Sequence, residues 1–356
     1  MKVLLNGATG GTNFGDFLFA RMFHDAVSAQ VGEENVFWYE SRYCLSDFYK
    51  RHLKCRSRKH KLRDIDALIC ISGGYFCGGD VTLRQYLIRY LRYFHLCMRC
   101  ILRKIPIAIV GVDIARPNSR IMDRIQRFIL QRAELVVVRN EESLEQAKRY
   151  GVKNPLCTAD TAHSISPDLY EHCAMQEEIA QITGKKLFFH VQPSQKEEAR
   201  RLLPVVDRFV KNHPEYSVVV GADQYWSGDT SVEELAKEFS CSKVVVNRFD
   251  DPLALCKVLD AMDLIITPKL HVGIVGATLE KTVVSFSVHT EKIGRFYHQL
   301  GEDERSLPMK DFSEEKALSL LEKYKDVPIR VNPEILRASR KNLEYLSEFI
   351  NKQLEG

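Results

Sequence analysis

Short apolar runs alternate along this chain with segments of helical periodicity, and this alternation constrains the fold more than any other feature. The runs cover residues 2–6, 35–39, 67–72, 105–112 and 135–139 in the first half, and 186–191, 216–222, 243–247, 263–268 and 282–287 in the second. Continuous apolar runs of this length are typical of strands buried on both faces of a parallel sheet. We therefore expect an α/β protein with two doubly wound, Rossmann-like domains.

The weakest region for strand and core signals is 166–184, which we interpret as the crossing between the domains. We expect an N-terminal domain over 1–172, a C-terminal domain over 173–331, and a C-terminal helix over 332–356. That helix could stand apart or pack back on the N-terminal domain. In such folds ligands bind beyond the carboxyl ends of the strands, so we expect the ligand between the two domains.

Composition indicates a soluble globular protein, with 45% hydrophobic and 28% charged residues in 356. No uncharged apolar stretch reaches the length of about 18 residues that a membrane-spanning helix needs, and no signal peptide is visible. The 10 cysteines have no regular spacing, which favours a reducing, cytoplasmic location. Cys97 and Cys100 form a C-x-x-C without a second ligand pair, so we interpret them as structural and expect no metal.

The opening segment, "KVLLNGATGGTNFGD", runs from a strand into a glycine-rich loop that is similar to a dinucleotide-binding turn. Gly7 and Gly10 fit that fingerprint, but the third glycine position is Asn13, and Asp16 puts a carboxylate where a phosphate would favour positive charge. Glu40 follows the next strand, so a nicotinamide site stays an alternative. No Tyr-x-x-x-Lys pair occurs in the chain, and we favour another ligand.

Cations follow several of the predicted strands. Arg139 ends one strand, Lys269 and His271 follow another at the start of a helix, and His289 and Lys292 follow a third. If these side chains meet, they suit a small ligand with carboxylate and phosphate groups. A salt bridge between Arg139 and an Asp, and a structural role for His271, are the alternatives.

Five motifs, taken in order, resemble the polysaccharide pyruvyl transferase family. They are "GGTNFGD" (10–16), "ISGGYFCGG" (71–79), "VVVRNEES" (136–143) followed by "YGVKN" and Asp160, "TPKLHVGIVGA" (267–277) and "EKIGRF" (291–296). The resemblance spans about residues 7–301. It implies a two-domain architecture of the glycosyltransferase-B type.

The resemblance also implies a reaction, the transfer of pyruvate from phosphoenolpyruvate onto a sugar of a polysaccharide or of its lipid-linked precursor, forming a pyruvate ketal. No cofactor is implied, because phosphoenolpyruvate is a co-substrate. We expect His271 as the acid and Asp16 as the base. The expected substrate-binding residues are Asn13, Gly15, Gly73, Gly74, Arg139, Ser143, Lys269, Leu270 and Lys292.

The chain departs from the family pattern at two positions, and this keeps two alternatives open. Lys269 stands where the family has Arg, which keeps the charge but loses the bidentate fork. Asn140 stands where the family has Asp. The alternatives are a nucleotide-sugar-dependent glycosyltransferase or epimerase of the same architecture, and a non-catalytic homologue.

The N-terminal half carries a basic surface that the net charge of +4 conceals, since residues 50–63 and 81–112 contain no acid. Periodicity predicts a helix over 83–104 with one apolar and one basic face. The apolar face comprises Leu83, Leu87, Tyr90, Leu91, Phe94, Met98 and Ile101, and the basic face Arg84, Arg92, His95, Arg99 and Arg103. We expect this surface to dock on the inner face of the cytoplasmic membrane rather than on nucleic acid.

Overall fold

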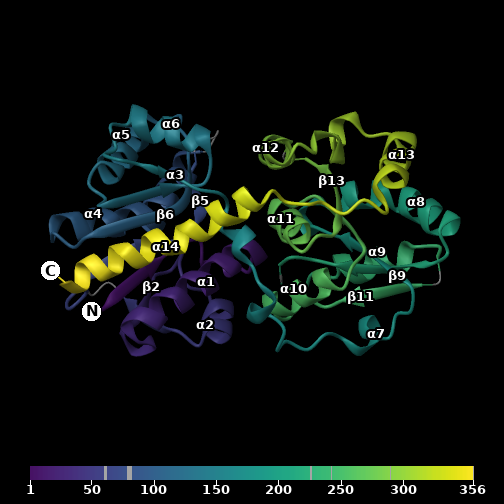
Figure 1. Cartoon of the computed structure of the whole chain (residues 1–356), viewed down its shortest axis with the longest axis horizontal. Coiled ribbons are helices and arrows are strands. Elements are labelled where there is room, and N and C mark those ends of the chain that lie inside the picture. The colour runs from purple at the N-terminus through teal and green to yellow at the C-terminus, as the bar shows by residue number, and fades with distance from the viewer. Residues whose placement is uncertain (60–61, 78–81, 225–226, 242, 289, 356) are drawn as a thin grey trace. The chain divides into compact units, whose positions relative to one another are not determined.

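The computed structural model describes residues 1–59, 62–77, 82–224, 227–241, 243–288 and 290–355, and it divides into two compact units (Figure 1). The first unit comprises Met1–Thr12, Asp16–Ser164 and Pro333–Gly356, and the second comprises Asn13–Gly15 and Ile165–Asn332. The division therefore falls after Ser164, before the expected boundary at residue 172. The segment Asn13–Gly15 from the opening loop belongs to the second unit.

A parallel sheet with strand order β3-β2-β1-β4-β6-β7-β8 forms the first unit, and β5 also pairs with β6. Its strands are β1 (Val3–Asn6), β2 (Val36–Glu40), β3 (Arg56–Lys59), β4 (Ala67–Cys70), β5 (Gly73–Phe76), β6 (Ile107–Ile114), β7 (Leu135–Val138) and β8 (Leu156–Cys157). Its helices are α1 (Phe14–Val31), α2 (Asp47–Leu53), α3 (Leu83–Arg89), α4 (His95–Leu102), α5 (Arg120–Leu130), α6 (Glu141–Arg149) and α14 (Pro333–Glu355). The strand order reverses between β1 and β4, which is where doubly wound folds bind ligands.

The second unit repeats this plan around a parallel sheet with order β11-β10-β9-β12-β13-β14. Its strands are β9 (Lys185–His190), β10 (Tyr216–Gly221), β11 (Val244–Asn247), β12 (Leu264–Thr267), β13 (Thr282–Ser287) and β14 (Ser306–Pro308). Its helices are α7 (Glu177–Ala180), α8 (Lys196–Asn212), α9 (Ser231–Glu238), α10 (Pro252–Asp260), α11 (Leu270–Thr278), α12 (Thr290–Leu300) and α13 (Glu314–Tyr324). The expected pair of Rossmann-like domains is confirmed.

Each apolar run of the sequence forms a strand, and the strands that the pattern missed are short. The most informative of them is β3 (Arg56–Lys59), which lies inside the basic segment 50–63 and pairs with β2 at the end of the described strand order. An edge strand need not be apolar, and charged side chains there discourage pairing with other chains. Part of the predicted basic surface is therefore the edge of the sheet.

The predicted helix over 83–104 forms, but the assignment of its faces was wrong at several positions. A π-helical segment, Tyr90–Phe94, lies between α3 and α4. Its wider turn shifts the side chains after it relative to those before it, which a constant 100° step does not anticipate. Leu87 and Leu91 are 57% and 37% exposed rather than buried, whereas Tyr93 is 6% exposed.

The buried side of this helical region joins the core of the first unit. Its buried members are Tyr86, Tyr93, Phe94, Leu96, Cys97 and Cys100. Tyr90, Met98 and Ile101 pack against this core, as predicted. The C-x-x-C motif lies in the same core, where Cys97 Sγ is 3.6 Å from Cys70 Sγ.

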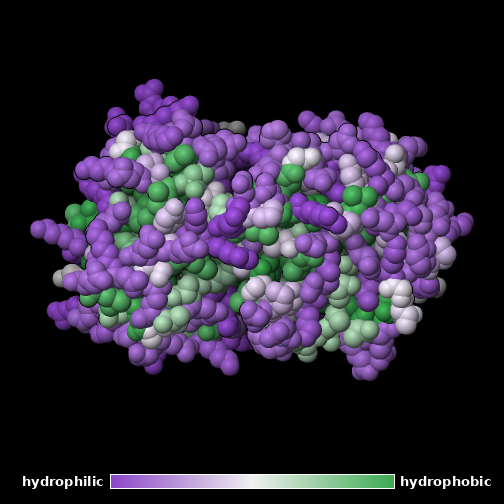
Figure 2. All heavy atoms as spheres, in the orientation of Figure 1, coloured by the Kyte–Doolittle hydropathy of each residue, from purple (hydrophilic) through white to green (hydrophobic). Residues whose placement is uncertain are grey.

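Within the described residues, no helix combines the length and apolarity needed to cross a bilayer. On the face of the molecule shown in Figure 2, hydrophobic side chains come in small patches that hydrophilic side chains separate.

The C-terminal helix α14 packs against β6 and the short turn Thr161–Ser164 of the first unit (Figure 1). It is fixed there by buried polar side chains. Asn342 donates to the Ala159 carbonyl at 2.9 Å and accepts from the Thr158 hydroxyl at 2.7 Å. Ser339 donates to the Asp160 carbonyl at 2.7 Å. A buried amide that bonds to a loop carbonyl and a loop hydroxyl in this way fixes the register of the helix on its sheet.

Replacing Asn342 tests how much this anchor contributes. Asn342→Ala leaves buried polar groups of the 158–160 loop without their partner, so we expect the free energy of unfolding to fall by about 1–3 kcal/mol. Urea denaturation followed by circular dichroism measures the change. Lys341→Ala, at the exposed neighbouring position, is the matched control and should stay within about 0.5 kcal/mol of wild type. Equal stabilities for both variants would contradict an anchoring role.

Candidate functional sites

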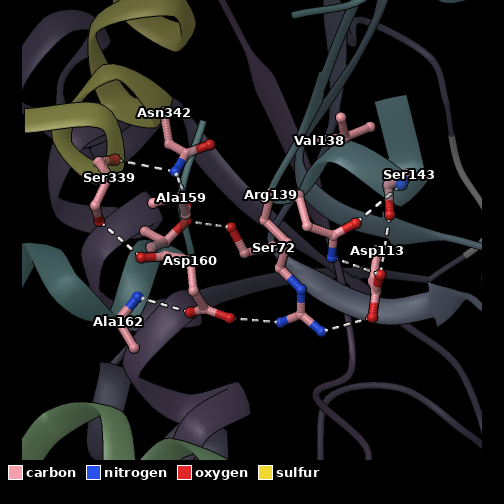
Figure 3. A network of polar contacts seen from close by, with 12 residues as sticks. Ser72, Asp113, Val138, Arg139, Ser143, Ala159, Asp160, Ala162, Ser339 and Asn342 are labelled. Carbon is pink, nitrogen blue, oxygen red and sulfur yellow. Dashed lines mark hydrogen bonds and ion pairs between the residues drawn. The ribbon is translucent and has the colours of Figure 1, made fainter. Parts of the chain in front are cut away.

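Arg139 lies at the end of β7 in a buried network of polar side chains (Figure 3). Its Nη1 is 2.7 Å from Asp160 Oδ2, and its Nη2 is 3.0 Å from Asp113 Oδ2. Burial opposes its charge, but Asp160 and Asp113 raise the pKa of Arg139 above its ordinary value. The guanidinium is therefore charged and held between two carboxylates.

Two neighbouring residues of the same motif complete this network. Ser143 Oγ donates to Asp113 Oδ1 at 3.0 Å and accepts from the Ile114 N–H at 2.8 Å. Asn140 Nδ2 donates to Asp113 Oδ1 at 3.0 Å, and Asn140 Oδ1 caps α6 by accepting from the Ser143 N–H at 2.9 Å. An ionised Asp at position 140 could not donate to Asp113, so Asn140 suits the network that is present.

The salt bridge that the sequence left as an alternative for Arg139 is thus the arrangement found. Both of its Nη atoms bind carboxylates, and the side chain is 7% exposed. Ser143 is fully buried. We assign both residues to holding β6, β7 and the loop after β8 together.

The second unit gathers polar side chains at the carboxyl ends of the adjacent strands β9, β10 and β12. His190 Nδ1 is 2.7 Å from the Thr267 hydroxyl, and His190 Nε2 is 3.4 Å from Asp223 Oδ1. Lys269 Nζ is 3.8 Å from Asp223 Oδ2. We call His190, Asp223, Thr267, Lys269 and His271 the Lys269 cluster.

Asp223 is the negative centre of this cluster. Burial disfavours the charged carboxylate of Asp223, but His190, 3.4 Å away, and the nearby Lys269 lower its pKa overall. The carboxylate is therefore ionised at neutral pH and offsets part of the positive charge of Lys269. Sequence reasoning missed His190 and Asp223, although His190 lies near the end of the apolar run 186–191 and Asp223 directly follows the run 216–222.

The segment Asn13–Gly15, which belongs to the second unit, packs against this cluster. The Phe14 N–H donates to the Asp223 carbonyl at 2.9 Å. A Cβ on Gly15 would lie 1.9 Å from Nδ1 of His271. No real Cβ makes so close a contact, so position 15 must be glycine for His271 to occupy its place. Phe14 and Gly15 of the first motif therefore lie beside Asp223 and His271.

A cavity of about 340 Å³ lies in the first unit, at the point where the strand order reverses between β1 and β4. We call it the tyrosine pocket. Its lining residues are Ala8, Asp16, Gly74, Tyr75, Gln85, Ile88, Arg89, Arg92 and Tyr93. The rings of Tyr75 and Tyr93 stack at 4.5 Å with 22° between their planes. Burial raises the pKa of Tyr93 to about 12, so its hydroxyl stays protonated and can donate a hydrogen bond.

The predicted site residues thus divide among three places. The second unit contains the Lys269 cluster with Asn13, Gly15 and Leu270. The tyrosine pocket is lined by Asp16 and Gly74, with Gly73 beside them at the start of β5, and the buried network contains Arg139 and Ser143. Lys292 is exposed on α12. His289 and residues 78–80 of the second glycine loop lie outside the described residues. Among the residues described, no group of three or more His, Cys, Asp or Glu side chains could hold a metal ion.

Comparison with known proteins identifies a family and a fold. A family described as polysaccharide pyruvyl transferase matches this chain over residues 13–290. No curated protein sequence matches it.

Among solved structures, the UDP-GlcNAc 2-epimerase of Neisseria meningitidis bound to UDP-GlcNAc has a TM-score of 0.68 at 11% identity, covering 98% of this chain and 100% of its own. A Methanocaldococcus jannaschii UDP-GlcNAc 2-epimerase in complex with UDP-GlcNAc and UDP has a TM-score of 0.61 at 10% identity, covering 98% and 100%. At such identities the likeness shows the fold alone, and it confirms the expected glycosyltransferase-B-like class.

Removing the Arg139 side chain should lower the stability of the fold, and this effect should exceed any direct effect on ligand binding. Arg139→Ala leaves two buried carboxylates without their cation, and loss of one partner of such a pair costs about 3–5 kcal/mol. Thermal and urea unfolding measure this loss, with Arg149→Ala on the exposed side of α6 as control. A variant that unfolds like wild type but no longer binds phosphoenolpyruvate would instead support the ligand contact expected from the sequence.

Gly15→Ala tests the contact between the opening loop and His271. The added Cβ must displace the imidazole ring, so the NMR signals of His271 should shift. Gly11→Ala is the matched control in the same loop, because a Cβ there has no atom within 4 Å, and it should leave those signals unchanged. Identical His271 signals in Gly15→Ala and wild type would show that the ring does not occupy the position described.

Proposed function

Because the chain belongs to the polysaccharide pyruvyl transferase family, we propose that it transfers the pyruvyl group of phosphoenolpyruvate to two hydroxyls of one sugar, forming a pyruvate ketal. The acceptor is a sugar of a polysaccharide or of its lipid-linked precursor. The observation that carries the proposal is the Lys269 cluster, where a lysine, a histidine and a helix N-terminus share the carboxyl edge of one sheet.

The reaction defines what such a site must supply. A proton is added to the methylene carbon of phosphoenolpyruvate, and a sugar hydroxyl bonds to the neighbouring carbon. The C–O bond to phosphate then breaks, and a second hydroxyl closes the ketal. The two hydroxyl protons balance the proton gained by the new methyl group and the proton carried by the released phosphate. An acid, a base and an anion-binding site are therefore needed.

Lys269 and the start of α11 suit the anionic end of phosphoenolpyruvate. Lys269 is the N-cap residue of α11, and its own side chain makes no capping hydrogen bond. The first N–H groups of a helix bind phosphate or carboxylate readily. We assign Lys269 to the anion and His271, in the first turn, to the acid. Lys292, exposed on α12, is a further predicted cation.

Asp16 suits the role of base toward a sugar hydroxyl. It lies in the first turn of α1 and lines the tyrosine pocket. The volume of about 340 Å³ is at the lower end of the range for small-molecule sites, which fits one sugar unit. We therefore assign the tyrosine pocket to the acceptor.

A lipid carrier for the acceptor and docking on a membrane surface stay predictions. Features of the first unit support them in part. Leu87 and Leu91 are exposed near Arg84 on α3 and the π segment. Exposed leucines beside cations are typical of surfaces that contact anionic lipid. We propose that the protein acts in the cytoplasm, at the inner face of the membrane, on sugars carried by a lipid.

The full-length protein tests this function when it is mixed with phosphoenolpyruvate and a panel of acceptor sugars. We expect phosphate release coupled to a gain in acceptor mass that corresponds to pyruvyl addition. His271→Ala should slow turnover by about 10²–10⁴-fold, as expected for loss of a general acid. His172→Ala, at an exposed histidine of the same unit, is the control. Lys269→Arg should keep or improve activity, and Lys269→Met should lose phosphoenolpyruvate binding.

Two results would decide against this function. One is binding of a uridine or guanosine nucleotide with turnover of the nucleotide sugar, which would favour the nucleotide-sugar-dependent alternative. The other is absence of phosphate release with every acceptor while phosphoenolpyruvate still binds, which would favour a non-catalytic homologue.

A further inference from the structure

We propose that the tyrosine pocket binds its sugar through a phosphate or diphosphate on the anomeric carbon, with Arg89 and Arg92 as the anion ligands. The identification of that sugar as the acceptor rests on the proposed function. The phosphate site itself rests on the contents of the pocket.

The charges of the pocket are unequal. Arg89, Arg92 and Asp16 are the charged residues among its described lining, so two guanidinium groups share the cavity with one carboxylate. Arg139 provides a comparison within the same unit, because its guanidinium lies between two carboxylates. Among these described lining residues the positive charge exceeds the negative charge, and a phosphate would supply the missing negative charge.

The guanidinium of Arg92 has a hydrogen-bond donor without an acceptor among the described residues. Within the described part of the chain it makes no ion pair, and its Nε is buried without a hydrogen-bond partner. Its one side-chain hydrogen bond is long, 3.5 Å from Nη1 to the Tyr93 hydroxyl. A buried guanidinium donor without a partner is costly, and an anion in the pocket would provide the acceptor.

Arg89 is held in place by a carbonyl and makes no ion pair with a described residue. Its Nη1 donates to the carbonyl of Cys77, which orients the guanidinium without supplying a negative charge. Arginine binds phosphate with several donors at once. Arg89 and Arg92 are three residues apart in a helical region, so both can reach one ligand group.

The π segment explains why Arg92 lines the pocket. Simple periodicity places Arg92 on the basic outer face with Arg84 and Arg99, whereas in the structure it lines the cavity. Single π turns are costly within helices and occur frequently at functional sites. Here the turn aligns Arg92 and Tyr93 with Arg89.

The remaining walls suit a sugar ring. Tyr75, Tyr93 and Ile88 offer apolar surface for the C–H faces of a sugar, and Gln85 and Asp16 offer partners for its hydroxyls. A sugar 1-phosphate combines these two requirements, since its phosphate and its ring are adjacent. Its natural source is either a lipid diphosphate carrier or a nucleotide diphosphate, and the exposed Leu87 and Leu91 beside the pocket residues favour the lipid.

Calorimetric titration of the full chain without phosphoenolpyruvate tests the phosphate site. The probes are glucose, galactose and N-acetylglucosamine, each with its matching 1-phosphate. We expect at least one 1-phosphate to bind about tenfold or more tightly than its free sugar. Arg92→Gln and Arg89→Gln should each remove about tenfold of that affinity or more. Arg84→Gln, an exposed arginine of the same helix, is the matched control and should bind like wild type.

Further experiments distinguish a lipid-linked phosphate from a nucleotide-linked one. They also distinguish a failure of the phosphate site from a failure of the proposed function. Glucosyl diphosphate is offered as its undecaprenyl conjugate in phosphatidylcholine vesicles and as UDP-glucose. If the natural ligand is carried by a lipid, the double variant Leu87→Ser, Leu91→Ser should weaken binding of the undecaprenyl conjugate and leave binding of UDP-glucose unchanged. Lys269→Met should leave binding of the sugar phosphates intact and abolish binding of phosphoenolpyruvate. Equal affinity for sugars and their phosphates, unchanged affinity in Arg92→Gln, or no binding of any phosphate would overturn the phosphate site, whatever the result with phosphoenolpyruvate.

Discussion

The buried ion pairs of Arg139 hold together the part of the first unit on which much else depends. One guanidinium joins Asp113 in β6 to Asp160 after β8, and the loop that carries Asp160 is also the loop that α14 contacts through Ser339. Buried ions are costly to desolvate, so the pairs stabilise only because each carboxylate also accepts hydrogen bonds. Asp113 receives them from Asn140 and Ser143, and Asp160 from the Ala162 N–H.

The carboxylates that contact a cationic side chain distinguish cations with a structural role from cations that can bind an anionic ligand. Arg139 has a carboxylate on each Nη atom, whereas Lys269 has one carboxylate at 3.8 Å, which His190 also approaches. Arg92 has none among the described residues. The charge that a side chain still presents after its internal partners are counted indicates where an anionic ligand would gain most. This criterion is the basis on which we propose an anion-binding place in each unit, at the Lys269 cluster and in the tyrosine pocket.

The sequence predicted the fold well because apolar runs report burial directly, and each run became a strand. Its failures have physical causes. The π segment at Tyr90–Phe94 changed the helical register, so Leu87 and Leu91 are exposed and Arg92 lines a cavity. His190 and Asp223 were missed because a polar residue at a strand end carries no signal until the neighbouring strands are known. Arg139 was ambiguous for the same reason, since its partners come from β6 and from the loop after β8.

The two departures from the family pattern now have different meanings. Asn140 is accounted for, because its amide donates to Asp113 and caps α6, so this change need not alter the reaction. Lys269 is different, since it lies in the cluster that we assign to phosphoenolpyruvate. A lysine presents its charge at one atom, where an arginine offers a planar fork, so the start of α11 must supply more of the orientation. Gly15 then matters for the anion as well as for the acid, because the room it leaves lets the first turn of that helix keep its place.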